Sequence, residues 1–271
     1  MDDSLRFGFG DNWRRFLAEL DEDRIAAAEE SLGAMLGPAS LAGRTFLDAG
    51  SGSGLFSLAA RRLGARVHSF DYDPASVACT QELRRRYFPD DPAWTVEQGD
   101  ILDRRYVEGL TPAEVVYSWG VLHHTGDLWA ALANAAGLVA PSGTLFVAIY
   151  NDQGRASRVW TRVKRTYNQA PPALRQVILG ASFLRLWGPT LARDLVRGHP
   201  LASWRNYRGV RGMSAWRDLV DWVGGYPFEV ASPAAVRDFL RPRGFLPFKS
   251  VECGRGLGCN EFVLRRTQRP R

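Results

Sequence analysis

The fold is decided by the stretch Phe46-Leu47-Asp48-Ala49-Gly50-Ser51-Gly52-Ser53-Gly54, in which a short apolar run meets an acidic residue and three alternating glycines. Glycine tolerates backbone angles and close approaches that a Cβ would forbid, so the pattern predicts a tight turn between a strand and a helix over residues 55–63. The first N–H groups of that helix have no partner inside it and would face a bound cofactor. The stretch therefore predicts a nucleoside-binding site in an α/β protein.

The spacing of the glycines separates the candidate cofactors. A dinucleotide fingerprint needs glycine at position 55, which is leucine, and a phosphate-binding P-loop needs a Lys-Ser/Thr pair that is missing. The pattern Asp-x-Gly-x-Gly-x-Gly instead resembles motif I of the class I S-adenosylmethionine (SAM) methyltransferases. From the glycines alone, another α/β nucleotide site or a plain turn is the alternative.

A second acidic residue ends the next apolar run, 23 residues after Asp48. The run is Val67-His68-Ser69-Phe70-Asp71, and a carboxyl group at the end of a second strand can accept hydrogen bonds from a ribose diol. Asp73 and Pro74 precede an amphipathic run over residues 75–86 and suit the cap and first turn of a helix. We therefore assign Asp71 to the ribose and Asp73 to the helix cap.

Three further segments carry the resemblance to these methyltransferases. Residues 94–101 read as a third strand followed by an acid and an apolar residue, which in the family face the adenine amino group and cover the ring. The resemblance implies these roles for Asp100 and Ile101. Residues 114–118 read as a fourth strand that leads into the family's motif IV, and residues 141–150 give a tight turn and an apolar fifth strand, as expected at the centre of a sheet.

The likeness is close over residues 44–151 and loose over 228–265, and it is nearest to the ubiquinone- and menaquinone-biosynthesis group (methyltransferase types 11 and 12). One departure is Ala113-Glu114, where the family usually has Phe-Asp. The resemblance implies a Rossmann-like class I methyltransferase, an α/β fold whose seven-stranded, mostly parallel sheet has a helical insertion after the fifth strand, with SAM as cofactor. The predicted cofactor-binding residues are Trp13, Asp48, Gly50, Ser51, Gly52, Asp71, Tyr72, Asp100, Ile101, Ser118 and Trp119.

Length and composition fit one α/β domain with an insertion. The chain has 271 residues, of which 45% are hydrophobic, enough for a sizeable core. We expect an N-terminal helical arm or lid (1–40), a SAM-binding core (41–152), a helical substrate cap (153–227) and a C-terminal part of the core sheet (228–271).

Targeting and metal signals are missing from the sequence. No run of 18 apolar residues occurs and the first residues are acidic, so we expect neither a membrane span nor a secretory signal. Cys79, Cys253 and Cys259 lack metal-ligand spacing, so we expect reduced thiols, no metal and a cytoplasmic location. Nothing in the sequence indicates an oligomeric state.

The expected cap is strongly basic. Residues 153–226 hold twelve Arg and one Lys against three Asp, a local charge of +10 that leaves −4 for the rest of the chain. The segment also holds five of the nine tryptophans: Trp160, Trp187, Trp204, Trp216 and Trp222.

Four interpretations of this basic segment are open. We favour an anionic small acceptor, held by arginine forks and tryptophan walls, with Arg158 and Trp160 as substrate-binding residues. Nucleic acid is less favoured, because no compact nucleic-acid-binding module is evident. An arginine-rich amphipathic helix over residues 183–197 could instead lie on anionic lipid, or the charge could be a solvated outer face.

Polar residues follow the fourth and fifth strands. His123 and His124 lie beside the expected methyl site, where either histidine could act as general base or pack structurally. Tyr150 and Asn151 are predicted to bind substrate, and Asp152 to orient a histidine or bind substrate, with a turn before the next helix as the alternative.

The N-terminal arm carries one further cofactor candidate. Trp13 lies near glycines in the expected lid and could cover the cofactor or anchor the arm to the core. The sequence as a whole predicts SAM-dependent methylation of a small molecule, with O-methylation favoured over N- or C-methylation. A tRNA or other nucleic-acid methyltransferase, and a binding protein without chemistry, are the alternatives.

Overall fold

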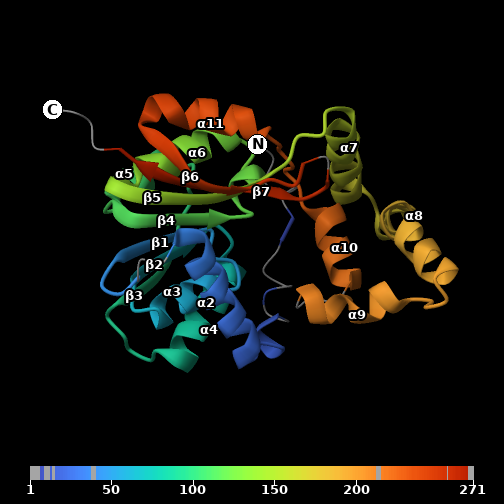
Figure 1. The fold of residues 1–271 in the computed structure, drawn as a ribbon, viewed down its shortest axis with the longest axis horizontal. Coiled ribbons are helices and arrows are strands. Elements are labelled where there is room, and N and C mark those ends of the chain that lie inside the picture. The colour runs from blue at the N-terminus through green and yellow to red at the C-terminus, as the bar shows by residue number, and fades with distance from the viewer. Residues whose placement is uncertain are drawn as a thin grey trace. The chain divides into compact units, whose positions relative to one another are not determined.

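A computed structural model of the chain describes residues 7–8, 13, 16–37, 41–211, 215–254 and 256–267. The chain divides into two units (Figure 1). The sheet unit consists of Gly8–Gly154 and Glu229–Arg271, and the helical unit consists of Met1–Phe7 and Arg155–Phe228.

Seven strands form a single sheet in the sheet unit, in the order β3-β2-β1-β4-β5-β7-β6. They are β1 (Thr45–Ala49), β2 (Arg66–Asp71), β3 (Trp94–Gln98), β4 (Ala113–Trp119), β5 (Val139–Tyr150), β6 (Phe245–Val251) and β7 (Cys259–Arg266). Strands β1 to β5 are parallel, and β7 runs antiparallel to both of its neighbours. The predicted fold is confirmed. The chain order reverses between β1 and β4, the point where open α/β sheets bind their ligands.

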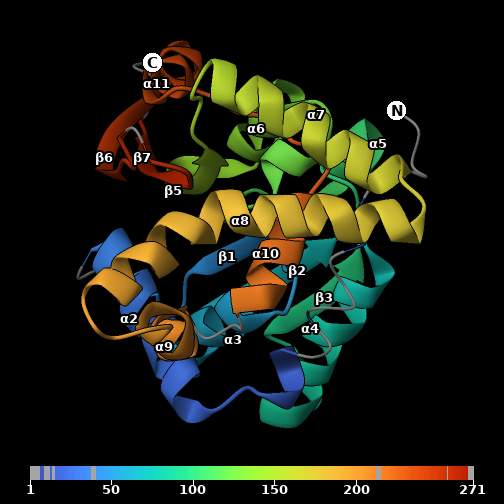
Figure 2. The same ribbon diagram turned by 90° about the vertical axis from the view of Figure 1, so that its right-hand side faces the viewer.

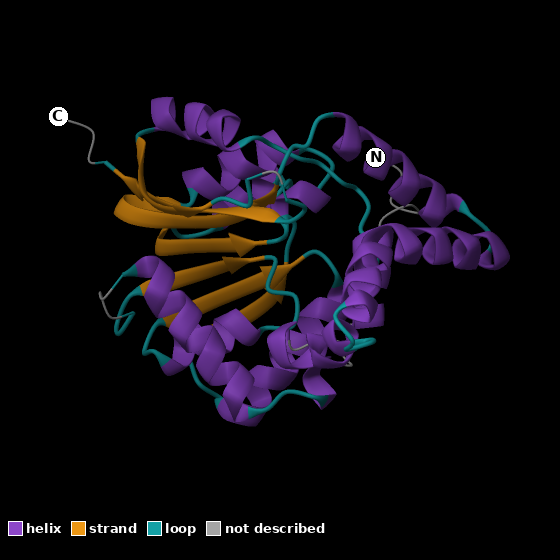
Figure 3. Cartoon of the chain, turned by 45° about the vertical axis from the view of Figure 1, so that its right-hand side comes forward, coloured by secondary structure: helices purple, strands orange, loops and turns teal. Residues whose placement is uncertain are grey.

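Helices cover both faces of the sheet, as Figures 1 and 3 show. One face carries α2 (Glu22–Leu36), α3 (Leu55–Arg62) and α4 (Pro74–Tyr87), whose buried side chains form one core with Phe46 and Trp94. The other face carries α5 (Arg104–Gly109), α6 (Leu128–Gly137) and α11 (Pro233–Leu240), which form a second core with Val116 and Leu145. The central strands read as continuous apolar runs because they are buried on both faces.

The predicted cap of α4 is present, and a serine caps α11. The Asp73 carboxylate accepts the Ala75 N–H at 2.9 Å at the start of α4, and the Ser232 hydroxyl accepts the Ala235 N–H at 3.2 Å at the start of α11. The amphipathic helix expected over residues 183–197 is instead the second half of α8 (Pro172–Val196). That prediction missed the true start because Pro172 suits the first helical turn and the internal Pro189 does not end the helix.

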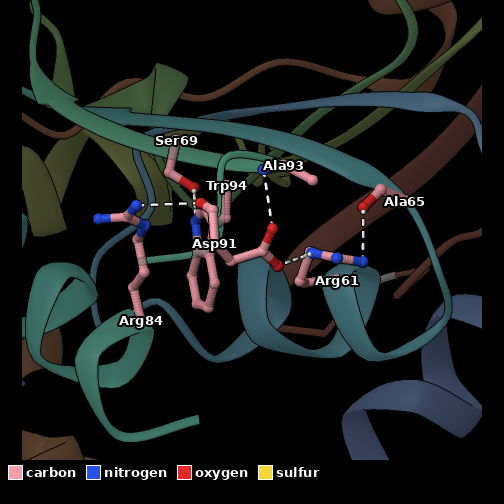
Figure 4. A network of polar contacts seen from close by, with 7 residues as sticks. All are labelled: Arg61, Ala65, Ser69, Arg84, Asp91, Ala93 and Trp94. Carbon is pink, nitrogen blue, oxygen red and sulfur yellow. Dashed lines mark hydrogen bonds and ion pairs between the residues drawn. The ribbon is translucent and has the colours of Figure 1, made fainter. Parts of the chain in front are cut away.

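A polar network fastens β3 to the helices beside it (Figure 4). The Asp91 carboxylate accepts hydrogen bonds from Arg61 Nε at 2.6 Å and from the Ala93 N–H at 2.8 Å. The guanidinium of Arg61 holds the pKa of Asp91 below its usual range. Trp94 Nε1 donates to the Ser69 hydroxyl at 2.9 Å, which connects this network to the centre of the sheet.

The helical unit is inserted between the end of β5 and α11. At its base, the Ala231 N–H donates to the Tyr150 carbonyl at 3.0 Å, and Asn151 and Ala231 form a parallel bridge. The outgoing and returning chain segments are therefore joined by backbone bonds that belong to the sheet unit.

Four helices build the helical unit: α7 (Arg155–Gln169), α8, α9 (Ala202–Arg211) and α10 (Ala215–Gly224) (Figure 2). Its core consists of Tyr167, Leu179, Leu219 and Val223 with partly buried neighbours. Two pairs of tryptophans meet edge to face, Trp160 with Trp222 at 5.9 Å and Trp187 with Trp204 at 4.7 Å between ring centroids. Most of the tryptophans thus fill the interior of this unit.

Lys164 is a fully buried cation in this core. Its Nζ donates to the Trp222 carbonyl and lies 4.3 Å from the centroid of a Trp222 ring and 4.6 Å from that of Phe228. Aromatic faces attract a cation but replace little of its hydration. Burial therefore lowers the pKa of Lys164 to about 7, although the charge of Asp221 opposes this change.

We expect the Lys164→Met variant to differ from wild type in the pH dependence of its stability. An unfolded lysine has a pKa near 10.4, so between about pH 7 and 10 the unfolded chain binds more protons and the free energy of unfolding of wild type rises with pH. Methionine removes this slope. The difference in unfolding free energy between the two proteins should change by about 3–5 kcal/mol from pH 6 to pH 10, with the variant favoured at pH 6.

Urea unfolding followed by tryptophan fluorescence at pH 6, 8 and 10 measures this difference. The control is Arg165→Gln, a change at the exposed neighbouring residue, which should track wild type. Parallel stability curves for wild type and Lys164→Met would contradict the buried, depressed lysine.

Candidate functional site

The glycine turn lies at the carboxyl end of β1, beside the reversal of strand order. Gly50, Gly52 and Gly54 have φ angles of +87°, +55° and +81°, which side chains with a Cβ rarely adopt. The N–H groups of Gly50 and Ser51 both donate to the Phe70 carbonyl, at 2.8 and 3.1 Å. The turn is thereby held against the end of β2.

Each glycine also permits a close contact. A Cβ on Gly50 would lie 2.4 Å from Val121 Cγ1, in the loop after β4, and a Cβ on Gly52 would lie 3.2 Å from the indole of Trp13. The first contact joins the two loops on either side of the switch point. The second places Trp13 against the turn, which suits the predicted lid, although its role over a cofactor stays a prediction.

Asp71 holds two turns together. Its Oδ2 accepts the Gly52 N–H and its Oδ1 accepts the Asp73 N–H, both at 2.9 Å. Burial raises the pKa of Asp71 to about 6, and the two N–H bonds counteract that effect. A carboxylate has about four acceptor positions, so two remain for hydroxyl donors. The group fits a ribose diol, and that role stays a prediction.

Asp48 lies beneath the turn, with only 2% of its surface exposed. The Ser57 hydroxyl donates to its Oδ2 at 2.5 Å and is 2.7 Å from the Ser69 hydroxyl, which Trp94 also reaches. Burial raises the pKa of Asp48 to about 7, and the charge of Asp71 raises it further. In the structure, Asp48 supports the turn through this buried chain of hydroxyls.

The remaining predicted cofactor residues fall into two groups. Four of them form hydrogen bonds within the protein. Ser51 Oγ lies 2.9 Å from Thr80 Oγ1, and Ser118 Oγ donates to the Ala49 carbonyl. Asp100 Oδ1 accepts the Leu102 N–H, and the carbonyl of the buried Ile101 accepts a hydrogen bond from Asn134. The other two, Tyr72 after β2 and Trp119 at the end of β4, are 39% and 41% exposed. These aromatic side chains are accessible at the edge where the strands end.

The two histidines form a cluster with Tyr150. His123 and His124 lie on the 3-10 turn η2 (Leu122–His124), and the ring centroids of His123 and Tyr150 are 3.9 Å apart. The Tyr150 N–H donates to His123 Nδ1 at 3.3 Å. His123 is fully buried, whereas His124 is partly exposed and its centroid lies 4.5 Å from that of His123.

Glu229 is a site residue that the sequence analysis missed. Its carboxylate accepts the N–H groups of Gly126 and Leu128 at 3.0 and 3.1 Å, and its own N–H donates to the His123 carbonyl at 3.0 Å. Burial raises the pKa of Glu229. It fixes the loop between η2 and α6 from about one hundred residues away, so no local signal could have identified it.

The predicted substrate residues are distributed over both units. The buried Asn151 anchors the β6–β7 hairpin, through its Nδ2 to the Gly254 carbonyl at 2.8 Å and its Oδ1 to Asn260. Asp152 is exposed, and its Oδ1 accepts the Gly154 N–H in a turn. Arg158 and Trp160 belong to α7 of the helical unit, where Arg158 is exposed and Trp160 packs on Trp222. The substrate roles of all these residues stay predictions.

Neither a metal-binding cluster nor a membrane-spanning helix is present among the described residues. No cluster of histidine, cysteine and acidic side chains among them could hold a metal ion. None of the helices in the described part of the chain is long and apolar enough to cross a membrane. Cys79, Cys253 and Cys259 form no disulfide with one another.

The strand order, the glycine turn at its switch point and the acid ending β2 together define a Rossmann-like class I methyltransferase. A family described as a methyltransferase domain matches residues 16–187. The chain belongs to this family, as the sequence predicted.

The relatives include members of the predicted group. The ubiquinone biosynthesis O-methyltransferase of Methylobacterium sp. (strain 4-46) is 28% identical over 165 residues, which are 59% of this chain and 55% of that protein. The tRNA U34 carboxymethyltransferase of Methylococcus capsulatus is 33% identical over 198 residues, 70% of this chain and 60% of that protein. The matches thus span little more than half the length of these relatives.

Solved structures support the fold. The magnesium protoporphyrin IX methyltransferase from Synechocystis PCC 6803 with bound SAH superposes with a TM-score of 0.55 at 14% identity, covering 95% of this chain and 94% of that one.

We expect Gly50→Ala to weaken cofactor binding because the new Cβ meets Val121. The strained φ and the overlap together should cost about 2–4 kcal/mol of stability and lower SAH affinity roughly tenfold or more. Gly120→Ala is the matched control, since Gly120 has a similar φ of +77° and nothing within 4 Å of an added Cβ. Calorimetric titration and thermal unfolding report both effects.

The double variant Gly50→Ala/Val121→Ala should recover part of the loss, because it removes the two closest contacts, those with the Cγ atoms of Val121. It keeps the φ strain and the 2.9 Å contact with the Cβ of residue 121. Equal losses in Gly50→Ala and Gly120→Ala, with no recovery in the double variant, would contradict a steric origin.

Proposed function

We propose that the protein transfers the methyl group of SAM to a hydroxyl oxygen of an anionic small molecule, with His124 as general base. Bound SAM supplies a methyl carbon already activated by its sulfonium, so the protein needs mainly to align the acceptor, exclude water and accept a proton. The O-methyltransferase relatives support a hydroxyl oxygen as the methylated atom. The net charge of +10 over residues 153–226 supports an anionic acceptor. The exposed rings of Tyr72 and Trp119 offer it apolar contacts.

The proposal of His124 rather than His123 as general base rests on the hydrogen bond from the Tyr150 N–H to His123 Nδ1. A nitrogen that accepts a hydrogen bond is unprotonated, so the neutral ring of His123 carries its proton on Nε2. His123 can therefore take up a second proton only by losing the bond to Tyr150. This favours His123 as a positioning residue and leaves the partly exposed His124 to accept the proton of the acceptor.

His124→Ala should lower kcat about 100-fold or more and leave SAM affinity within twofold, because it removes only the proton acceptor. His123→Asn is the matched variant, since the amide oxygen can replace Nδ1 as acceptor for the Tyr150 N–H. We expect it to keep most of kcat and the acidic limb of the pH profile, which His124→Ala should lose. Methyl transfer from labelled SAM to dihydroxybenzoates, which combine hydroxyls with a carboxylate, provides the assay.

Two outcomes would overturn this proposal. Loss of the acidic limb in His123→Asn, with full kcat in His124→Ala, would exchange the roles of the histidines. Label entering bulk tRNA rather than any carboxylated or phosphorylated small molecule would favour the activity type of the tRNA-modifying relative.

The proposed ribose contact of Asp71 predicts pH-dependent cofactor affinity. Hydroxyl donors favour the ionised carboxylate, whose pKa is about 6 before binding. SAM affinity should therefore rise as the pH increases through 6 and level off above 7. Asp71→Asn should weaken binding by roughly 1.5–3 kcal/mol at pH 8 and abolish this dependence.

Asp73→Asn is the control for Asp71→Asn, because asparagine also caps helices and the change removes a neighbouring negative charge. Calorimetry between pH 5 and 8 measures the affinities. An unchanged SAM affinity in Asp71→Asn would remove Asp71 from the cofactor site.

A further inference from the structure

One residue holds the backbone around His124 from both sides. Glu229 donates its N–H to the His123 carbonyl at 3.0 Å, directly before His124. Its side-chain carboxylate accepts the Gly126 N–H at 3.0 Å, two residues after His124. His124 and Thr125 therefore lie between two hydrogen bonds that a single distant residue provides.

The short segment between these two bonds is a compact turn. The His124 N–H donates to the Val121 carbonyl at 2.8 Å. The Thr125 hydroxyl donates to the Leu122 carbonyl, also at 2.8 Å. Gly126 ends the turn with a φ of +88°, which side chains with a Cβ rarely adopt. Because these local bonds hold the turn together, a displacement of its end at Gly126 would move the backbone of His124 as well.

Glu229 is itself fixed to the sheet unit through the residues that follow it. The Ala231 N–H donates to the Tyr150 carbonyl at the end of β5, at 3.0 Å, and the Ala231 carbonyl accepts the Asp152 N–H at 3.4 Å. Tyr150 also donates its own N–H to His123 Nδ1. The histidine turn is thus held by the end of β5 and by the segment around Glu229, and these two segments are bonded to each other.

A helix cap and a general base are the alternative roles for the Glu229 carboxylate. It also accepts the Leu128 N–H at 3.1 Å, but Asp127 already caps α6 through the Ala130 N–H at 3.0 Å. As a base it is less suited than His124, because backbone N–H groups occupy acceptor positions on the carboxylate and oppose the rise of its pKa on burial. Holding the histidine turn accounts for the side-chain bond to Gly126 and for the backbone bond before His124.

We propose that Glu229 is a positioning residue for His124, and that its N–H and its carboxylate together fix the turn from which His124 accepts the proton of the methyl acceptor. This role rests on the proposed function, in which His124 is the general base. A base must lie within hydrogen-bond reach of the proton that it takes up, so a small displacement of its backbone lowers kcat.

Glu229→Gln tests this role, because the amide has one acceptor oxygen and its NH₂ group cannot accept an N–H. We expect kcat for methyl transfer from labelled SAM to 3,4-dihydroxybenzoate to fall about tenfold, with both KM values within twofold of wild type. Asp127→Ala is the matched control, since it removes the side-chain cap of the same helix and leaves the bonds of Glu229 in place. It should lower the melting temperature and keep the kcat of wild type.

A double-mutant cycle separates positioning from an independent effect. If Glu229 acts through His124, Glu229→Gln should have no further effect on kcat in protein that already carries His124→Ala. A residue that supports the fold in general would lower kcat by the same factor in both backgrounds.

Proton NMR tests the position of His124 without any acceptor. The chain has four histidines, so their ring Cε1–H resonances can be assigned with single variants. The His124 resonance should shift and broaden in Glu229→Gln and should match wild type in Asp127→Ala. Thermal unfolding confirms that both variants fold.

Three results would overturn the positioning role alone. They are an unchanged His124 resonance in Glu229→Gln, equal losses of kcat in Glu229→Gln and Asp127→Ala, and a further tenfold loss in the His124→Ala background. Full kcat in His124→Ala is a distinguishable outcome, because it would overturn the proposed base and the role of Glu229 together.

Discussion

The carboxylate of Asp71 is the interaction on which the site depends, because it holds the turn after β1 and the turn after β2 at the same time. The parallel pairing of β1 with β2 brings Ala49 opposite Phe70, so the glycine turn emerges directly beside this carboxylate. Two backbone N–H groups compensate part of its desolvation. Asparagine, the neutral residue of the same size, has one acceptor oxygen and one NH₂ group, so it could not accept one bond on each terminal atom as Asp71 does.

A second buried carboxyl group lies beneath the first. The charges of Asp48 and Asp71 oppose each other's ionisation, and Ser57, Ser69 and Trp94 supply donors on the side of Asp48 only. The polar chain that begins at the β3 network in Figure 4 therefore ends under the cofactor turn. The hydroxyls of Ser69 and Ser57 thus connect the packing of Trp94 on β3 to the buried carboxyl group of Asp48 on β1.

The parts of the fold that could be predicted are those encoded by neighbouring residues. The glycine turn and the cap at Asp73 depend on backbone angles and short-range bonds, and each has a local sequence pattern. Glu229 could not be found in this way, because it acts on Gly126 from a distant part of the chain. The contact of Gly50 with Val121 is equally non-local, as is the bond that sets the tautomer of His123.

Composition was a weaker guide within the helical unit. The tryptophans suggested walls for a substrate, yet most of them pack on one another and on Lys164. The large rings of Trp160 and Trp222 pack against the core of this unit beside its aliphatic side chains. The predicted length of the helix over residues 183–197 was too short. Apolar residues of α8 occur on both its inner and its outer side, so the amphipathic pattern does not mark where the helix begins.

The backbone bonds that join Tyr150 and Asp152 to Ala231 have an evolutionary consequence. They close the insertion at its base, so the loop-closure entropy of whatever lies between these points depends only weakly on its length. A lineage can therefore lengthen, replace or delete the inserted helices without re-registering the sheet. The sheet unit and the inserted helices can therefore change independently in evolution. The same junction is a suitable place to exchange the inserted helices between related proteins.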